Sequence, residues 1–153
     1  MTDADRGAYR LVDRLPTPEE HRALAESVGW GEAFRWDAVP ASLAGSCCAV
    51  GALADDGTPV AMGRVVGDGA FFFYLQDIAV RPDLQGQGLG SRVTERLLEL
   101  VHARAGGDAF VGLFATAEAR PLYARLGFDG DSPMQGMWQV LRRRPADGPA
   151  PGS

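Results

Sequence analysis

The sequence predicts one α/β (α+β) domain built on a mixed, mostly antiparallel sheet. Its 153 residues are enough for a single domain with a proper core, and 46% hydrophobic residues is ordinary for a globular protein. Three apolar stretches separated by tight turns predict an antiparallel meander. A long amphipathic helix separates the third stretch from a fourth, and such a crossover predicts that those two strands run parallel.

In the first half of the chain we expect an edge strand, a helix and two strands of the meander. Residues 9–15 alternate weakly, as an edge strand does. Thr17 is suited to cap a helix that starts with Pro18 and ends near Gly29. Residues 29–45 are irregular, and their aromatic side chains either cap the core or line a substrate entry. The meander strands are expected at 47–53 and 58–66, around a turn at 55–57.

In the second half we expect the central strand, its crossover helix and three further elements. Residues 70–80 are long enough to form the centre of a sheet. Residues 91–105 carry apolar side chains at helical spacing and end at a pair of glycines. The remaining expected elements are a strand at 110–114, a short helix over 119–126 closed by Gly127, and a last strand at 134–141.

A glycine-rich loop joins the central strand to the long helix. Residues 76–95 read QDIAVRPDLQGQGLGSRVTE, with Gly86, Gly88 and Gly90 just ahead of or inside the helix start. The first N–H groups of a helix lack partners inside it, the helix dipole adds partial positive charge, and glycines let an anion approach. The loop is therefore either a flexible turn or a phosphate cradle, and its neighbours favour the cradle.

The same loop nearly fits a dinucleotide-binding fingerprint, as Gly86-x-Gly88-x-x-Ser91. The third glycine is missing, and no repeated strand-helix-strand pattern follows. Asp108 lies near the spacing of the fingerprint's acidic residue, but it follows two glycines in a turn. A dinucleotide oxidoreductase is therefore the weaker interpretation.

The net charge and the positions of the cysteines and histidines argue against a nucleic-acid partner, a disulfide and a metal site. The net charge is −5, whereas nucleic-acid binding needs a concentrated basic face. Cys47 and Cys48 are neighbours in an apolar run and are expected to be reduced core thiols. Neither His21 nor His102 has a metal-ligand spacing, so no metal is predicted.

The ends of the chain carry no expected structure or targeting signal. No apolar run approaches the roughly 20 residues that cross a membrane, and the start lacks the pattern of a secretory signal. We therefore expect a cytoplasmic protein with no membrane partner. Its domain is predicted over residues 9–144, between a flexible start at 1–8 and a disordered, proline- and glycine-rich tail at 145–153.

Two motifs together resemble the GNAT acetyltransferase superfamily. Ile78-Ala79-Val80-x-Pro82 followed by Gln85-x-x-Gly88-x-Gly90 is similar to the end of that family's central strand and its pyrophosphate loop. The run PLYARLGF at 121–128 resembles the second GNAT signature. The resemblance, to small bacterial single-domain members, implies the GNAT fold, with helices on both faces of the sheet and a splayed central pair of parallel strands.

The resemblance also implies the cosubstrate and the residues that hold it. Members transfer an acetyl group from acetyl-CoA to a primary amine by direct attack in a ternary complex, without a metal. Pantetheine pairs with the central strand, the pyrophosphate lies on the glycine loop, and Thr116 stands where many members carry asparagine near the sulfur. The implied cofactor-binding residues are Ile78, Ala79, Val80, Gln85, Gly86, Gln87, Gly88, Leu89, Gly90, Ser91 and Thr116.

The catalytic residues follow by the same resemblance. Tyr123 occupies the general-acid position, and the backbone N–H of Ile78 or Val80 is implied as the oxyanion donor. Many members have glutamate at the position of Gln76, which accepts no proton at neutral pH. We expect the amine to lose its proton through ordered water, with Asp77 as the alternative base. Strand alternation places Asp77 on the opposite sheet face from Gln76.

The acceptor stays open to small polyamines, arylalkylamines, aminoglycosides, amino acids and protein N-termini, that is, to a small-molecule or peptide amine. Dimers are common among similar proteins, so a homodimer is possible. A second interpretation is a GNAT-fold sensor or partner module that binds acyl-CoA without turnover. The missing glutamate supports that module, and Tyr123 supports the enzyme.

Overall fold

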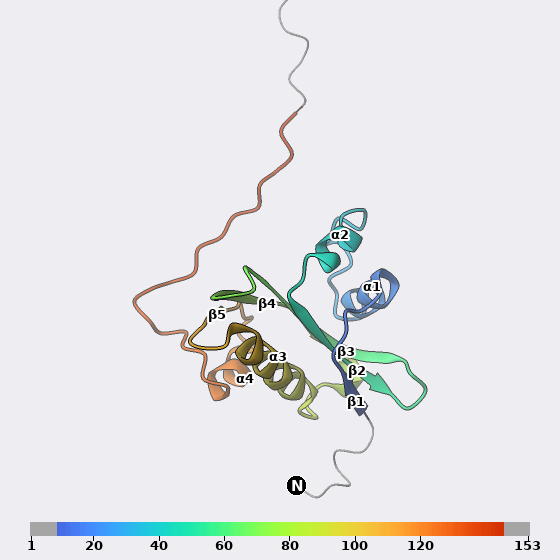
Figure 1. Ribbon diagram of the computed structural model, residues 1–153. Helices are drawn as coiled ribbons and strands as arrows, with labels where there is room; N and C mark the ends of the chain where they lie inside the picture. The colour runs from blue at the N-terminus through green and yellow to red at the C-terminus, as the bar shows by residue number, and fades with distance from the viewer. Residues whose placement is uncertain (1–8, 146–153) are drawn as a thin grey trace, which may run out of the picture.

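The computed structural model describes residues 9–145 as one five-stranded sheet with helices on both faces (Figure 1). The strand order is β1-β2-β3-β4-β5, in which the first four strands are antiparallel and β5 runs parallel to β4. The strands are β1 Tyr9–Val12, β2 Cys48–Ala54, β3 Pro59–Gly67, β4 Phe72–Val80 and β5 Phe110–Gly112. The helices are α1 Pro18–Ser27, α2 Val39–Ala44, the 3-10 turn η2 Pro82–Leu84, α3 Leu89–Ala105 and α4 Arg120–Arg125.

Most predicted elements are confirmed, and their local chemistry explains why. Thr17 caps α1 in a capping box, accepting from the N–H of Glu20 while the Glu20 carboxylate accepts from the N–H of Thr17. The antiparallel meander and the parallel β4–β5 pair are present as expected. Helix α2 was not predicted, since six residues are too few to show a helical repeat.

One predicted element is wrong. Residues 134–141 form no strand and extend away from the sheet (Figure 1). Their sequence suits a strand, but a strand exists only where another strand supplies its hydrogen bonds. The predictions of a flexible start at 1–8 and of a disordered tail lie outside the described residues, apart from residue 145.

Helix α3 covers one face of the sheet, and α1 with α2 covers the other (Figure 1). Val93, Leu97 and Val101 of α3 are buried in the main core together with apolar side chains of β2, β3 and β4. Gly63 of β3 lies directly under the helix, because a Cβ there would come within 2.8 Å of Leu97 Cδ1. The sheet and α3 therefore approach closely at the middle of β3.

A β-bulge interrupts β4 at Asp77. Met62 pairs with Ala79 and Arg64 with Gln76, so two residues of β4 oppose Gly63 alone. Asp77 has φ 57°, in the left-handed region that non-glycine residues rarely adopt. The extra residue reverses the alternation. Even-numbered residues therefore face α1 and α2 before the bulge, as Gln76 does, and face α3 after it, as Ile78 and Val80 do.

The pairing between β4 and β5 covers only the first third of β4. Residues 72–74 pair with residues 110–112, and β5 then ends. From residue 75 to 80, β4 has β3 on one side and no strand of residues 9–145 on the other. The parallel pair thus separates at Tyr74, as the resemblance implied. No helix within residues 9–145 has the length and apolar character needed to cross a membrane.

Candidate active site

The glycine loop has the geometry of an anion-binding helix start. Gly86 and Gly88 have φ of 79° and 82°, and a Cβ at either position would meet nothing within 4 Å. Gly88 is the N-cap of α3, and no side chain caps the helix. The N–H groups of the first turn of this 17-residue helix therefore have no side-chain cap, and the helix dipole favours a negative charge beside them.

The free edge of β4 presents backbone groups beside this loop. Arg81 donates its N–H to the Val60 carbonyl, and the register pairs Ala61 with Val80. In an antiparallel ladder, the backbone groups of successive residues point alternately toward the partner strand and away from it. Since the N–H of Arg81 points toward β3, the N–H and C=O of Val80 face the edge away from β3, as does the C=O of Ile78. The Val80 carbonyl accepts from Gln85 Nε2 at 3.0 Å. The Val80 N–H is therefore the better placed of the two predicted oxyanion donors.

Helix α4 joins the two sequence motifs in space. A Cβ on Gly90 would lie 3.2 Å from Leu122 Cδ1 and 3.7 Å from Val80 Cγ2, so the helix start, α4 and the end of β4 meet at one point. Tyr123 follows Leu122 and packs edge-on against Phe128, with ring centroids 6.0 Å apart. Burial raises the pKa of the Tyr123 phenol. The hydroxyl thus keeps its proton at neutral pH, as a general acid requires.

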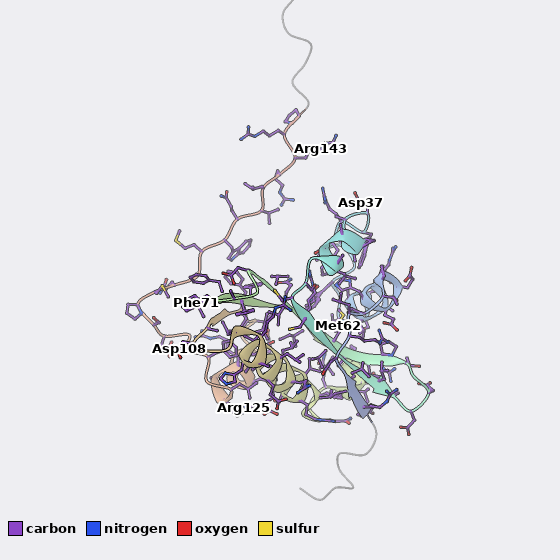
Figure 2. The ribbon with its side chains drawn as sticks, in the orientation of Figure 1. Asp37, Met62, Phe71, Asp108, Arg125 and Arg143 are labelled. Atoms are coloured by element: carbon purple, nitrogen blue, oxygen red, sulfur yellow. The ribbon has the colours of Figure 1, made fainter. Side chains whose placement is uncertain are left out.

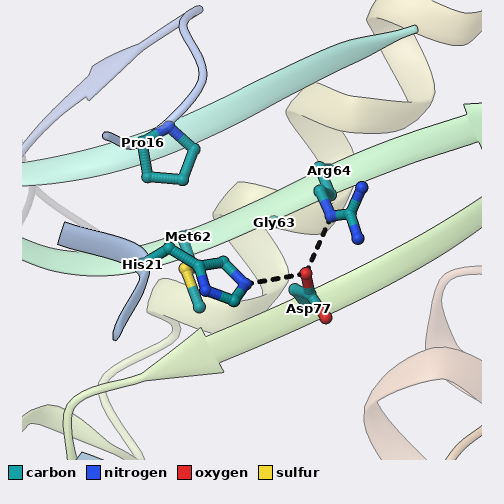
Figure 3. Close-up of a pocket in the computed structure, with 6 residues that line it drawn as sticks. All are labelled: Pro16, His21, Met62, Gly63, Arg64 and Asp77. Carbon is teal, nitrogen blue, oxygen red and sulfur yellow. Dashed lines mark hydrogen bonds and ion pairs between the residues drawn. The ribbon is translucent and has the colours of Figure 1, made fainter. Parts of the chain in front are cut away.

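The bulge brings a buried ionic cluster together on the face of β4 that packs against α1. Asp77 Oδ2 accepts from Arg64 Nε at 2.7 Å and lies 2.9 Å from His21 Nε2. Asp77 Oδ1 accepts from the Gln76 amide at 2.9 Å. Figure 3 shows the three charged or titratable side chains converging from α1, β3 and β4. His21 and Asp77 are nearly inaccessible, at 1% and 5% exposure.

This arrangement corrects one expectation. Alternation placed Asp77 on the opposite face from Gln76, but the positive φ at the bulge turns both side chains toward α1 and α2. Burial raises the pKa of Asp77, and the hydrogen bonds from His21 and Arg64, with the charge of Arg64, outweigh it and leave the pKa below its usual value. A carboxylate held in that form is a weak proton acceptor. The lowered pKa therefore argues against Asp77 as the base, and deprotonation through ordered water stays a prediction.

Arg64 ties the cluster to α2. Its guanidinium donates to the Ser42 carbonyl at 3.0 Å, to Ser42 Oγ at 3.0 Å and to Ser46 Oγ at 3.1 Å. Five N–H donors in a planar fork allow one arginine to hold both the carboxylate and this segment. The ionic cluster thus fixes the segment that covers this face of β4.

The sequence patterns do not indicate that three polar residues, His21, Arg64 and Tyr74, lie on this face. Only the apolar spacing around His21 and Arg64 could have pointed to them, since both occupy positions that face the core. Burial raises the pKa of Tyr74, and the negative charge of Asp77 acts in the same direction. The Tyr74 ring packs against the Phe114 ring where β4 and β5 separate, with ring centroids 5.7 Å apart.

Other predicted residues have local partners. The Thr116 hydroxyl accepts from the Ala119 N–H at 3.3 Å and so caps the turn before α4. On α3, the Arg96 guanidinium pairs with Asp13 and Glu99. Arg92 donates to the Tyr9 carbonyl at 3.4 Å. Both arginines are thus directed toward the N-terminal strand.

The irregular segment before α2 supplies packing for the cluster. Phe34 and Trp36 contact the His21 ring edge-on, with centroids 4.9 Å and 6.1 Å away. The hollow beside His21, Met62 and Asp77 leaves no space for a water-sized molecule, so it is too small to be a ligand pocket. No group of three or more metal-ligating side chains occurs in the described part of the chain.

Known proteins share this architecture. The sequence profile of the acetyltransferase (GNAT) family matches residues 10–128. A solved structure of a probable acetyltransferase from meticillin-resistant Staphylococcus aureus superposes with a TM-score of 0.77 at 29% identity, over 87% of this chain and 99% of that one.

Two curated relatives come from rice, Oryza sativa subsp. japonica. Serotonin N-acetyltransferase 2, chloroplastic, is 40% identical over 49% of this chain and 36% of its own length. Glucosamine 6-phosphate N-acetyltransferase 1 is 29% identical over 90% of this chain and 82% of its own length. The chain spans less than half the length of the first curated relatives it matches. From the profile match and the shared fold, we conclude that the chain belongs to the GNAT acetyltransferase family.

Proposed function

We propose that the protein transfers an acetyl group from acetyl-CoA to a primary amine by direct attack in a ternary complex. The observation that carries the proposal is the joint of β4, the glycine loop and α4, where an uncapped helix start, a free strand edge and the helix that carries Tyr123 meet. Membership of the GNAT family supports it.

The residues present fit a CoA thioester. The open positions beside Gly86 and Gly88 suit a pyrophosphate on main-chain nitrogens, and the free edge of β4 suits the amides of pantetheine. The bound cosubstrate would supply the activated acetyl group. We assign Gln85 through Ser91 to the pyrophosphate end and residues 78–80 to the pantetheine end. The assignment of Thr116, which lies just before α4, to the sulfur end of the cosubstrate stays a prediction.

Acetyl transfer needs three chemical functions, of which the chain would supply two and position water for the third. An alkyl amine with pKa near 10.4 loses its proton to ordered water on the polar face of β4, where Gln76 and Tyr74 lie. The Val80 N–H donates to the oxygen that gains negative charge as the amine attacks. Tyr123 donates its proton to the leaving sulfur, whose conjugate thiol has a pKa near 8.5.

The acceptor side of the proposal rests on β4 and α2. Asp77 stays ionised and pairs with Arg64, so the cluster holds Gln76 and the α2 segment in place without adding a net charge to this face. Similar proteins named for serotonin and glucosamine 6-phosphate set the first two acceptors to test.

The test is thiol release from acetyl-CoA with a panel of amines containing serotonin, glucosamine 6-phosphate, spermidine and an amino acid. Acceptor-dependent release, with the acetylated amine found by mass spectrometry, supports the enzyme. The chain contains no lysine, so acetylation of its own side-chain amines does not add to the signal. Tight CoA binding without release would favour the non-catalytic sensor or partner module.

A further inference from the structure

The two carboxylate oxygens of Asp77 have different partners. Oδ2 lies 2.7 Å from Arg64 Nε and 2.9 Å from His21 Nε2, whereas Oδ1 accepts from Gln76 Nε2 at 2.9 Å. In Figure 3 both dashed lines end on one oxygen of Asp77, and the other oxygen points away from them. The same carboxylate thus joins a buried cluster to Gln76, which is only partly buried.

The carboxylate decides which end of the Gln76 amide faces outward. An ionised carboxylate only accepts hydrogen bonds, so the amide nitrogen of Gln76 must face Asp77 and the amide oxygen, Oε1, must lie on the other side. Oε1 has no hydrogen bond within residues 9–145, and it is not enclosed, because His21 Nδ1 alone is both buried and unpaired among the side-chain nitrogens and oxygens of these residues. Gln76 therefore offers an accessible hydrogen-bond acceptor on the face of β4 beneath α1 and α2.

The rest of the cluster fixes this orientation. A guanidinium has five N–H donors and no acceptor, so Arg64 can only donate to Asp77. Its other donors hold residues 42–46 through hydrogen bonds of 3.0 to 3.1 Å. Met62 closes the layer between the sheet and α1, where it is buried with Leu24 (Figure 2). The Oδ2 position must therefore be filled by an accepting atom, in Asp77 or in any side chain that replaces it.

Gln76 lies within reach of the proposed reaction site. Val80, whose N–H is the proposed oxyanion donor, is four residues further along β4, and the bulge removes one step of the ladder. Three strand steps correspond to about 10 Å. A glutamine side chain and one water, joined by hydrogen bonds of about 2.8 Å, can bridge that interval to an attacking amine.

We propose that Asp77 is a positioning residue, which holds Gln76 so that Oε1 accepts a hydrogen bond from the water that takes the proton of the substrate amine. This inference rests on the proposed acetyl transfer. A water that donates to Oε1 becomes a better acceptor, because hydrogen bonds in a chain polarise one another. The N–H bond of the ammonium breaks, its proton passes through this water to solvent, and the freed electron pair attacks the thioester carbon. Gln76 itself gains no proton.

Asp77→Asn tests the orientation without changing the size of the side chain. Because Arg64 still donates, the asparagine oxygen must take the place of Oδ2, and its NH2 group takes the place of Oδ1. Gln76 must then turn its oxygen inward and present N–H groups outward, where they donate to the water. We expect kcat/KM for the amine to fall at least about tenfold, with KM for acetyl-CoA unchanged.

Gln76→Met removes the oxygen at a partly exposed position, where a side chain of similar size is tolerated, so it decides the question even if Asp77→Asn is too unstable to assay. It should lower kcat/KM for the amine to the same extent, and Asp77→Asn should add less than about a further twofold in that background. A residue that only stabilises the fold would lower activity in both backgrounds. The control Gln139→Met makes the same change at an exposed residue of the extended segment and should leave kcat/KM within about twofold of wild type.

A second readout does not depend on acetyl transfer. In side-chain amide NMR spectra, Gln76 is assigned from the signals missing in Gln76→Met. We expect one Gln76 proton of wild type to be shifted downfield by the carboxylate and to lose that shift in Asp77→Asn, and identical Gln76 signals in the two proteins would refute the orientation. A value of kcat/KM for the amine that Gln76→Met leaves within about twofold of wild type would refute the role of Gln76 but not acetyl transfer. A wild type without acceptor-dependent thiol release would overturn the proposed acetyl transfer together with this inference.

Discussion

Replacing Arg64 with methionine tests the ionic cluster most directly. Both partners are buried, with the Arg64 and Asp77 side chains 8% and 2% exposed. Removing one member of a buried ion pair costs about 3–5 kcal/mol, because the other charge stays buried without its partner. Arg64→Met also removes three hydrogen bonds to residues 42 and 46. We therefore expect the free energy of unfolding to fall by about 3–5 kcal/mol.

The measurement is urea unfolding at neutral pH, compared across wild type, Arg64→Met, Asp77→Asn, their double variant and one control. With a urea dependence of about 2 kcal/mol/M, the expected loss shifts the midpoint by roughly 1.5–2.5 M. The double variant Arg64→Met with Asp77→Asn removes both charges and should lose at least about 2 kcal/mol less than the sum of the single variants. The control Arg10→Met changes an exposed arginine of β1 and should stay within about 0.5 kcal/mol of wild type.

Two results would refute this reasoning. Single variants that each cost under about 1 kcal/mol would mean that the buried pair contributes little. Additivity within about 0.5 kcal/mol would mean that Arg64 and Asp77 act separately, despite the 2.7 Å between Nε and Oδ2.

Three further predictions concern the site. Tyr123→Phe should lower kcat at least about tenfold and leave CoA affinity unchanged, because the phenol acts on the leaving sulfur alone; unaltered kcat would remove Tyr123 from the reaction. Gly88→Glu should weaken CoA binding in calorimetry, whereas Gly57→Glu, at a similar φ of 84° in the β2–β3 turn, should not. Because the folded-state pKa of Asp77 is lowered, the ionised carboxylate stabilises the folded state fully above the ordinary carboxyl pKa. This contribution is lost as pH falls through the folded-state pKa of Asp77. The stability gap between wild type and Asp77→Asn should therefore shrink below about pH 4, and a gap that widens there would contradict the assignment.

The sequence was sufficient for the elements whose signals are local. The capping residues around Thr17 and the apolar stripe of α3 each specify an element without reference to the rest of the chain. The glycine loop was likewise recognisable, because a left-handed backbone at Gly86 and Gly88 needs glycine wherever the loop lies.

The rest depends on contacts between distant residues. Alternation along β4 failed at Asp77, because the bulge is created by register with β3 and leaves no mark in the apolar pattern. His21 joins the site from 56 positions away, which no motif encodes. Residues 134–141 have the composition of a strand, but composition does not say which strand they pair with.

The bulge at Asp77 has a consequence for how such a protein can be altered. Since it inverts side-chain direction within one strand, Tyr74 and Gln76 belong to the layer beneath α1 and α2, whereas Ile78 and Val80 pack with the layer of α3. Under the proposed function, Tyr74 and Gln76 face the acceptor and Ile78 and Val80 hold the thioester, so substitutions at the first pair leave the second pair unchanged. The two halves of a single strand behave as separate modules.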